Sequence, residues 1–310
     1  MKKKALVILS LAVITTIVGS RDLIAQARQK NKTTTKSSSG SNKQTKPSSV
    51  SLGNTTLSTD SLSRLKAVLV VGPIEDGTGE AIDRVKEIAS YLRSSGINVT
   101  EFYDPDTKWT AISQAAKGAH IFLYSGHGLY RGDKGKPGGF CLSRGENIPS
   151  SSIIKDLKLH KNALILFHTV CMGAGSSAED NRDIGIQMAI QRVSDYVHPF
   201  IELGAAGYYA NNGYNTIVPF LKEFFNKKNI KQIFESSVPK SNHIETTRKY
   251  SYNPKFEISI ASSNPKGTTM LTTYTNGVKK VVQIPSVKLY DMAFVGIPSF
   301  CVLDFFKSKL

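Results

Sequence analysis

Cysteine is scarce in this sequence of 310 residues, which contains three, at positions 141, 171 and 301. No spacing of cysteine and histidine typical of a zinc site is present, and there is no internal repeat. Basic and aromatic residues are not interleaved, and no recognition-helix pattern occurs, which disfavours a nucleic-acid-binding protein. We therefore predict no metal, no cofactor and no nucleic-acid partner, and an odd thiol that is free or paired between molecules.

Acidic residues are few beside basic ones, 24 against 40, and the formal net charge is +16. The excess is concentrated in the first 66 residues, which hold 12 Lys or Arg and 2 acids, a net +10. The later residues carry only the remaining +6. Most of the basic character therefore belongs to an N-terminal segment, which we interpret as a solvated arm rather than a binding surface.

The N-terminus has the pattern of a targeting segment. Lysines at 2–4 precede the apolar stretch 5–19, which has the length of a signal-peptide core and is short for a membrane span. A small-x-small site ends at Ala27, and a second candidate cleavage site ends at Ser20. The sequence predicts a signal peptide over 1–27, with an uncleaved anchor as the alternative. Both predict a secreted, periplasmic or cell-surface protein, and no stable membrane span is expected after cleavage.

Large apolar residues are almost absent from the segment 28–64, which is rich in Ser, Thr, Lys, Asn and Gln. Such a composition cannot bury enough surface to offset the entropy of ordering. We therefore predict a disordered, low-complexity, basic linker. The folded domain is predicted over 65–310, with a core over 65–238 and a β-rich tail over 239–310.

The core segment alternates apolar runs of strand length with stretches that have helical periodicity. The apolar runs lie at 65–72, 97–104, 121–128, 162–171 and 204–211. The helical stretches lie at 80–96, 110–117, 151–160, 182–203 and 215–229, and a small hairpin is expected over 139–148. This order predicts an α/β fold with a mostly parallel sheet and helices on both faces.

The tail has a different pattern. It contains three alternating runs, at 255–263, 268–275 and 278–285. The last two are joined by Asn276-Gly277, and Asn-Gly between alternating runs is a strong hairpin signal. We expect these runs to form a C-terminal antiparallel hairpin appendage. A last apolar run at 292–303 predicts one more buried strand, for which the edge of the sheet is one place.

Two apolar runs end in reactive side chains, His127 in SGHG and Cys171 in HTVCMGAG. Ligands of open parallel sheets bind outside the carboxyl ends of the strands, so adjacent strands would bring imidazole and thiol to one edge. An imidazole that accepts the thiol proton makes the thiolate a nucleophile toward a carbonyl carbon. The backbone N–H groups of Gly128 and Cys171 suit an oxyanion hole. The sequence thus predicts a Cys-His dyad.

SGHG after an apolar strand, with a cysteine 44 residues after its histidine, resembles the caspase-like cysteine peptidases. This group includes caspases, metacaspases, clostripain and gingipain types, and the bacterial CHAT-domain proteins. The CHAT and metacaspase-type bacterial members are nearest in motif. The segments 138–157 and 200–225 resemble the hairpin, strand and helices of CHAT and metacaspase sequences. The resemblance covers about residues 66–226. It implies a three-layer sandwich and an exported endopeptidase that cleaves polypeptides through a thioester acyl-enzyme.

The chain departs from the family pattern near the cysteine. The caspase signature QACRG is absent, and Thr169 stands where metacaspases and clostripain-like enzymes carry an acid that helps bind Arg or Lys. Glu75 and Asp76 lie in the loop comparable to the one that binds substrate in caspases, and carboxylates there would favour a basic side chain. The alternative is a solvated loop that caps the next helix. These three residues are therefore weak candidates for substrate binding.

Several alternatives stay open. A non-catalytic caspase-like binding module often lacks the histidine or the cysteine, whereas this chain keeps both. A transpeptidase would use the same dyad. His168 either points into the sheet or back toward the site. The stretches 131–139 and 173–183 flank the site and are expected to be flexible until substrate binds, and the oligomeric state is undetermined.

Overall fold

The structure of the protein is a computed structural model that describes residues 57, 59–264, 268–275 and 278–307. The predicted signal peptide and most of the predicted linker lie outside these residues. Within the described chain, the residues from 268 to 287 form one packed unit and the others form a second, larger unit.

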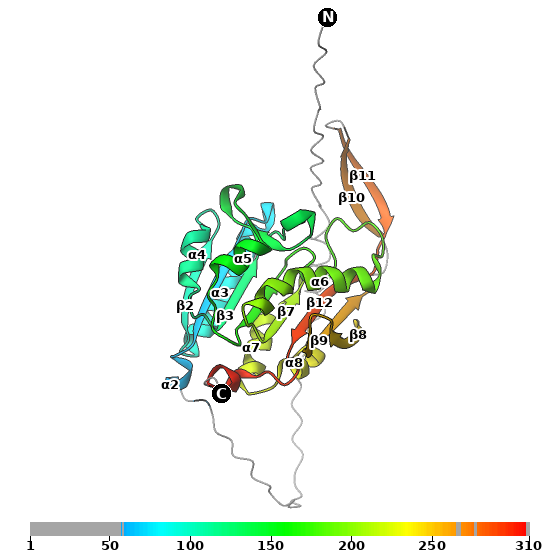
Figure 1. Ribbon diagram of the computed structural model, residues 1–310. Helices are drawn as coiled ribbons and strands as arrows, with labels where there is room; N and C mark the ends of the chain where they lie inside the picture. The colour runs from blue at the N-terminus through cyan, green and yellow to red at the C-terminus, as the bar shows by residue number, and fades with distance from the viewer. Residues whose placement is uncertain (1–56, 58, 265–267, 276–277, 308–310) are drawn as a thin grey trace, which may run out of the picture. The chain divides into compact units, whose positions relative to one another are not determined.

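The larger unit is built on one central sheet (Figure 1). Its helices are α2 (Thr59–Leu62), α3 (Thr78–Ser94), α4 (Trp109–Ala115), α5 (Ser150–Asp156), α6 (Gly185–Glu202), α7 (Ile217–Phe225) and α8 (Ile230–Ser237). The strands of the central sheet are β1 (Lys66–Val71), β2 (Asn98–Tyr103), β3 (Ile121–Ser125), β6 (Leu164–His168), β7 (Gly207–Asn211), β8 (His243–Tyr250), β9 (Asn253–Ser263) and β12 (Leu289–Gly296). A small hairpin pairs β4 (Gly139–Cys141) with β5 (Asn147–Pro149), as the sequence predicts.

The described strands of the central sheet follow the order β2-β1-β3-β6-β7-β12-β9-β8. Neighbours from β2 to β7 run parallel, and β12, β9 and β8 continue the sheet in antiparallel pairs. Every residue of β3, β6 and β7 is buried. Parallel strands covered on both faces read as continuous apolar runs, which is why these three were recognisable in the sequence. The predicted α/β fold with a mostly parallel sheet is confirmed.

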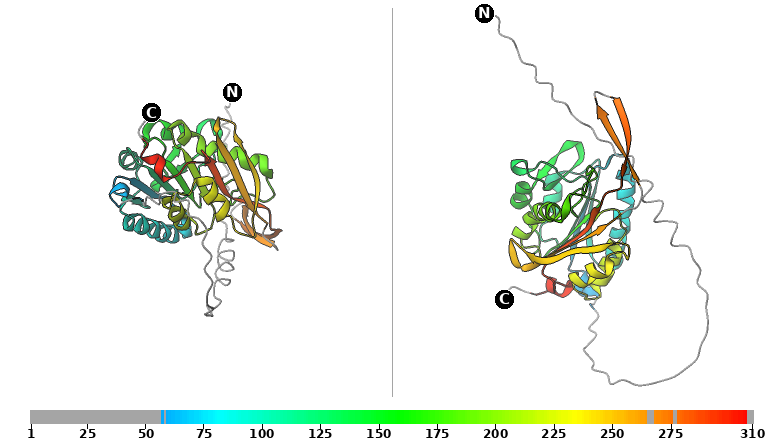
Figure 2. Two further views of the ribbon diagram at one scale, coloured as in Figure 1. Left: turned by 90° about the horizontal axis from the view of Figure 1, so that it is seen from below. Right: turned by 90° about the vertical axis from the view of Figure 1, so that its right-hand side faces the viewer.

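Helices cover both faces of the sheet, as the two views of Figure 2 show. One core cluster joins the sheet to α4, α5 and α6, and the other joins it to α3, α7 and α8. In β1, Val68 and Val70 belong to the first cluster, and Leu69 and Val71 belong to the second. Successive side chains of a strand point to opposite faces, so one apolar strand serves both layers.

The C-terminal tail does not form a single appendage. The hairpin of β10 (Thr268–Thr275) and β11 (Val278–Pro285) is present and antiparallel, as predicted. The run expected to precede it in the appendage is β9, which instead pairs with β12 in the central sheet. β8 has charged or polar residues at most positions, so no apolar run marked it.

The expected edge position of the last strand is wrong. β12 lies between β7 and β9, and it ends at Gly296 rather than near residue 303. Seven of its eight residues are buried. A strand with that burial needs a neighbour on each side, which an edge position cannot provide.

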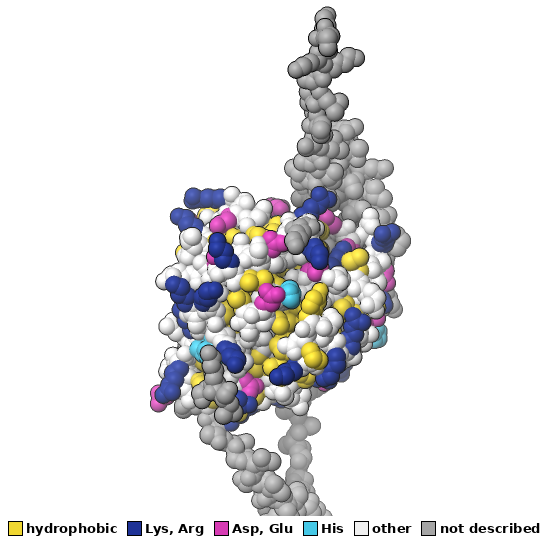
Figure 3. Space-filling model, in the orientation of Figure 1, with side chains coloured by type: hydrophobic (Ala, Val, Ile, Leu, Met, Phe, Trp, Pro, Cys, Tyr) yellow, Lys and Arg dark blue, Asp and Glu magenta, His cyan; other side chains and the backbone are white. Residues whose placement is uncertain are grey.

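The surface drawn in Figure 3 has Lys and Arg side chains along its rim and hydrophobic side chains gathered toward its middle. The basic side chains on this face stand mostly apart from one another. None of the helices in the described ranges combines the length and apolar character that crossing a membrane requires.

A buried carboxylate links β12 to its surroundings. Asp291 is 4% exposed. Its Oδ2 accepts hydrogen bonds from Ser263 Oγ at 2.6 Å and Tyr214 OH at 2.8 Å, and Asn242 Nδ2 lies 3.3 Å from Oδ1. Burial raises the pKa of Asp291 to about 6, although these donors act in the opposite direction.

The raised pKa of Asp291 makes the stability of the fold depend on pH. The native state holds this proton up to about pH 6, whereas the unfolded chain releases it near pH 4. The free energy of unfolding therefore falls as the pH rises through that window. In Asp291→Asn this fall should be absent. From pH 4 to pH 7, its stability relative to wild type should increase by roughly 2 to 3 kcal/mol, at 1.4 kcal/mol per pKa unit.

Urea unfolding of both proteins at the two pH values measures this difference. Asp76→Asn is the matched control for the loss of one carboxylate, because Asp76 is exposed and forms none of the contacts of Asp291. A stability difference for Asp291→Asn that is the same at both pH values would contradict the expectation.

Candidate functional site

The candidate site lies at the carboxyl edge of the parallel strands. β3 and β6 are adjacent, and their last residues, Ser125 and His168, are paired in register. His127 follows β3 by two residues, and Cys171 follows β6 by three. The two chemically reactive residues singled out in the sequence therefore lie on neighbouring loops at one edge of the sheet.

The loop that carries His127 is held from below by a buried tyrosine. The hydroxyl of Tyr124 lies 2.9 Å from the carbonyl oxygen of His127 and 2.7 Å from that of Cys141. The N–H of Cys141 also donates to the His127 carbonyl, at 3.1 Å. Gly126 has a φ of 152°, and a Cβ there would lie 2.4 Å from the Tyr124 hydroxyl. Only glycine permits this close turn over the tyrosine.

Cys171 lies in a tight turn flanked by two residues with positive φ. Thr169 has a φ of 56° and Met172 a φ of 64°. Non-glycine residues in this region are strained, and they persist where the surroundings fix them. The Thr169 N–H donates to Asn211 O at 2.8 Å, and the Met172 N–H donates to Ser176 O at 2.8 Å. The cysteine is half-buried, and its thiol is free.

Gly128 is a point of close contact between the two loops. A Cβ on Gly128 would lie 2.4 Å from the carbonyl oxygen of Cys171 and 2.3 Å from the hydroxyl of Tyr196. Glycine is therefore required for this contact. Neither the Gly128 N–H nor the Cys171 N–H donates to another residue in the described part of the chain.

The charge state of His127 depends on Cys171. A hydrogen bond with the Cys171 side chain is the largest cause that raises the pKa of His127, and the charge of Glu75 raises it further, while burial lowers it. The Nε2 atom of His127 lies 3.0 Å from Glu75 Oε1. Nε2 has no hydrogen-bond partner within the described residues, so its contact with Glu75 is an ion pair when the imidazole is protonated.

The three weak substrate-binding candidates occupy different surroundings. Glu75 begins the short turn η2 (Glu75–Gly77), has a φ of 39°, and faces His127. Its side chain is 69% exposed, so solvent weakens this ion pair. Asp76 and Thr169 are exposed. The sequence suggests a substrate contact or a helix-capping loop for Glu75. It does not reveal the ion pair with His127.

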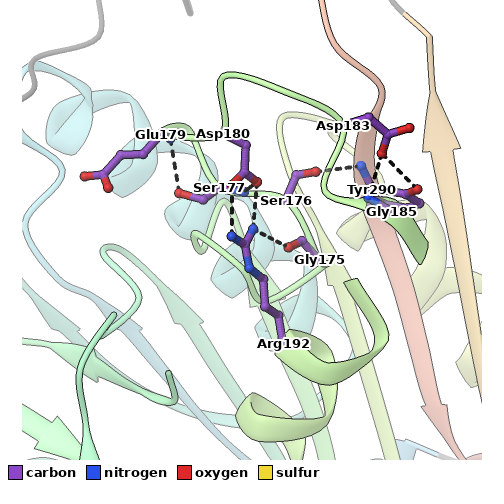
Figure 4. Close-up of polar contacts among 9 residues, drawn as sticks. All are labelled: Gly175, Ser176, Ser177, Glu179, Asp180, Asp183, Gly185, Arg192 and Tyr290. Carbon is purple, nitrogen blue, oxygen red and sulfur yellow. Dashed lines mark hydrogen bonds and ion pairs between the residues drawn. The ribbon is translucent and has the colours of Figure 1, made fainter. Parts of the chain in front are cut away.

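The loop after Cys171 is held by polar contacts (Figure 4). Asp180 accepts from Arg192 Nη1 at 2.7 Å and Nη2 at 2.9 Å, and Arg192 lies on α6. Arg192 Nη1 also donates to Gly175 O at 3.2 Å. Ser176 exchanges two hydrogen bonds with the backbone of Tyr290 on β12. A stretch expected to be flexible from its composition is therefore attached to a helix and a strand.

A cavity of about 430 Å³ lies along this loop. It is lined by Glu179, Asp180, Asn181, Arg182, Asp183, Ile184, Met188 and Arg192. Neither His127 nor Cys171 lines it, so we locate the candidate site from the paired side chains rather than from the cavity.

Tyr130 is a residue of this region that no sequence pattern marked. Its hydroxyl is buried and has no hydrogen-bond partner in the described part of the chain. Burial, and then the charges of Cys171, Glu179 and Asp180, raise its pKa. The pKa of the Tyr130 hydroxyl therefore responds to charge on the thiol and on the acidic loop. Its position depends on the fold of three loops, which a local pattern cannot reveal.

The described residues do not form a metal-binding site. The described residues contain no group of three or more His, Cys, Asp or Glu side chains that could hold an ion. The Asp180 carboxylate forms an ion pair with Arg192. The chemistry that this edge of the sheet supports is that of a thiol beside an imidazole.

The fold and site together define an α/β protein with a cysteine-histidine pair at the carboxyl edge of a parallel sheet. No protein-family model matches the sequence, and no curated protein matches it significantly. Among solved structures, the Arg-specific cysteine proteinase gingipain R is similar at 14% identity and a TM-score of 0.31. The match covers 81% of this chain and 64% of the gingipain R chain. At that TM-score the likeness adds nothing to a functional assignment.

The coupling of His127 to its two neighbours predicts a measurable change in its pKa. Cys171→Ala should lower the pKa of His127, because it removes the largest cause that raises it. Glu75→Gln should lower it by a smaller amount, because the charge of Glu75 contributes less. Titration of the imidazole C–H signals by NMR measures both values.

Asp76→Asn is the matched control for Glu75→Gln, since Asp76 is the next residue and is not among the causes that shift the pKa of His127. Its His127 pKa should equal that of the wild type. An unchanged pKa in Cys171→Ala would show that the thiol and imidazole do not interact in solution.

Proposed function

We propose that this protein is an exported caspase-like cysteine endopeptidase, with Cys171 as nucleophile and His127 as general acid and base. The observation that carries the proposal is the placement of His127 and Cys171 on neighbouring loops, two and three residues after the paired ends of β3 and β6. The Cys171 side chain also raises the pKa of His127. An imidazole with a raised pKa beside a thiol favours the imidazolium-thiolate pair, which is the reactive state. Export rests on the signal peptide predicted over 1–27.

The reaction follows from the groups at the edge of the sheet. The Cys171 thiol gives its proton to His127, and the thiolate attacks the carbonyl carbon of the scissile peptide bond. The N–H groups of Gly128 and Cys171 donate to the oxyanion of the tetrahedral intermediate. His127 then protonates the leaving amine as the C–N bond breaks, which leaves a thioester. Water, deprotonated by His127, hydrolyses the thioester and restores the thiol.

Glu75 has a supporting role in this scheme. Its carboxylate lies on the Nε2 side of His127, where it stabilises the imidazolium that forms when the thiol ionises. This role competes with the suggested contact between Glu75 and a basic substrate side chain. The substrate is therefore proposed as a polypeptide, with Glu75, Asp76 and Thr169 as weak candidates for its recognition. Gingipain R is described as Arg-specific. A peptide library that varies the residue before the cleaved bond measures the preference of this chain.

Peptide cleavage by matched cysteine variants tests the proposal. Wild type should cleave members of a positional-scanning peptide library, and Cys171→Ala should lose this activity by several orders of magnitude, because the nucleophile is gone. Cys141→Ala is the control. Cys141 is half-buried close to Cys171, and burial raises its pKa, so its removal should leave most of the activity.

The outcomes separate the proposed enzyme from its alternatives. Cleavage by Cys171→Ala at the wild-type rate would exclude the proposed nucleophile. An absence of cleavage, together with labelling of Cys171 no faster than that of Cys141, would favour a binding module. Transfer of the acyl group to an added amine in preference to water would identify a transpeptidase.

A further inference from the structure

Two buried polar residues lie side by side where β6 and β7 end. His168 is the last residue of β6, Asn211 is the last residue of β7, and the two are paired in register. His168 is 2% exposed and Asn211 is fully buried. The other positions of these two strands carry apolar side chains or glycine. Burying polar side chains costs free energy unless they are hydrogen-bonded, so this pair needs an explanation.

The pair forms a directed hydrogen-bond chain. His168 Nδ1 lies 2.9 Å from Asn211 Oδ1, and Asn211 Nδ2 donates to Thr216 Oγ1 at 3.0 Å. Burial lowers the pKa of His168 to about 4, so its ring is neutral at the pH at which most proteins work. Since the Asn211 amide nitrogen is turned toward Thr216, Oδ1 is the acceptor for His168. The His168 proton is therefore on Nδ1.

The backbone of the same strand end supports the turn that carries the nucleophile. The Thr169 N–H donates to Asn211 O at 2.8 Å. With its amide in the orientation that satisfies its neighbours, Asn212 Nδ2 donates to Val170 O at 3.2 Å. The two residues before Cys171 are thus bonded to the end of β7. The peptide group whose carbonyl receives the Thr169 N–H is held by the bond from the Asn212 N–H to Asp291 O at 2.8 Å. The side chain of Asn211 is held at both of its polar atoms.

We infer that His168 and Asn211 act as a positioning pair that sets the place of Cys171 relative to His127. The inference rests on the proposed function and names the residues that make its geometry precise. Thr169 has a strained backbone with a φ of 56°, and such a conformation persists only where neighbouring contacts impose it. His168 itself does not reach the reacting atoms. His168 orients Asn211, Asn211 bonds to the turn that carries Cys171, and the turn places the thiol.

Stability by itself would allow an apolar pair at these two positions. Replacing both partners of a buried hydrogen bond with apolar groups of similar shape is often nearly neutral. A sheet that only had to be stable could carry apolar residues at both positions, as it does one residue earlier with Phe167 and Ala210. What an apolar pair lacks is the directional bond between the ends of β6 and β7, from His168 Nδ1 to Asn211 Oδ1.

The test compares three variants for turnover and for thiol reactivity. In His168→Leu, kcat should fall by about tenfold to a hundredfold, since misplacing a catalytic group by about 1 Å costs on the order of 100-fold. KM should stay close to the wild-type value, because no substrate contact is lost. His168→Asn, whose amide nitrogen takes the place of Nδ1, should recover a large part of kcat. The double variant His168→Leu/Asn211→Leu should unfold in urea near the wild-type midpoint while keeping the low kcat.

A second measurement does not require peptidase activity. The rate at which iodoacetamide alkylates Cys171 should fall in His168→Leu and recover in His168→Asn, because the thiol is displaced from the imidazole and then returned. His160→Leu is the control. His160 is half-buried and stacks on His120, away from the Cys171 turn, so both kcat and the alkylation rate should stay at the wild-type level.

The result that overturns the inference is distinct from failure of the proposed function. Unchanged kcat and alkylation rate in His168→Leu would exclude a positioning role. A loss of kcat that follows a loss of stability, with no recovery in His168→Asn, would assign the pair a structural role only. If wild type cleaves no peptide, the proposed function fails, and the alkylation rates of Cys171 still decide whether the pair positions the thiol.

Discussion

The parallel pairing of β3 with β6 is the contact on which the rest of the site depends. Because the two strands run in the same direction and end in register at Ser125 and His168, the chain leaves both at the same edge of the sheet. A shift of one residue would turn the side chains of one strand to the opposite face. The register is strongly specified, since both faces of these strands are buried.

The supports of the nucleophile turn come from three directions. The end of β7 holds the residues before Cys171, and α6 and β12 hold the loop after it. The C-terminal strand β12, which the sequence predicted as a buried strand, is therefore part of the support of the site. Strain at Thr169 and Met172 is sustained because the turn is bonded on both sides, as strained backbone at functional sites generally is.

Much of the core was predictable because burial on two faces leaves a strong trace in the sequence. The apolar runs that became β1, β3, β6 and β7 contain few polar residues, and the helices between them have regular apolar spacing. β8 left no such trace, since its side chains are mostly solvated and its place depends on pairing with β9. β12 was recognised as a buried strand but misplaced, because an apolar run does not specify which strands lie beside it.

The sequence by itself determined the α/β class and the two apolar runs that lead to His127 and Cys171. These features are local, since each depends on hydrophobic periodicity or on the side chain at one position. Only the tertiary structure decided that Glu75 faces His127, that Arg192 holds the loop after Cys171, and that Asn211 bonds to His168. Each of these contacts joins residues far apart in the chain, and each exists only because strand order and register bring them within bonding distance.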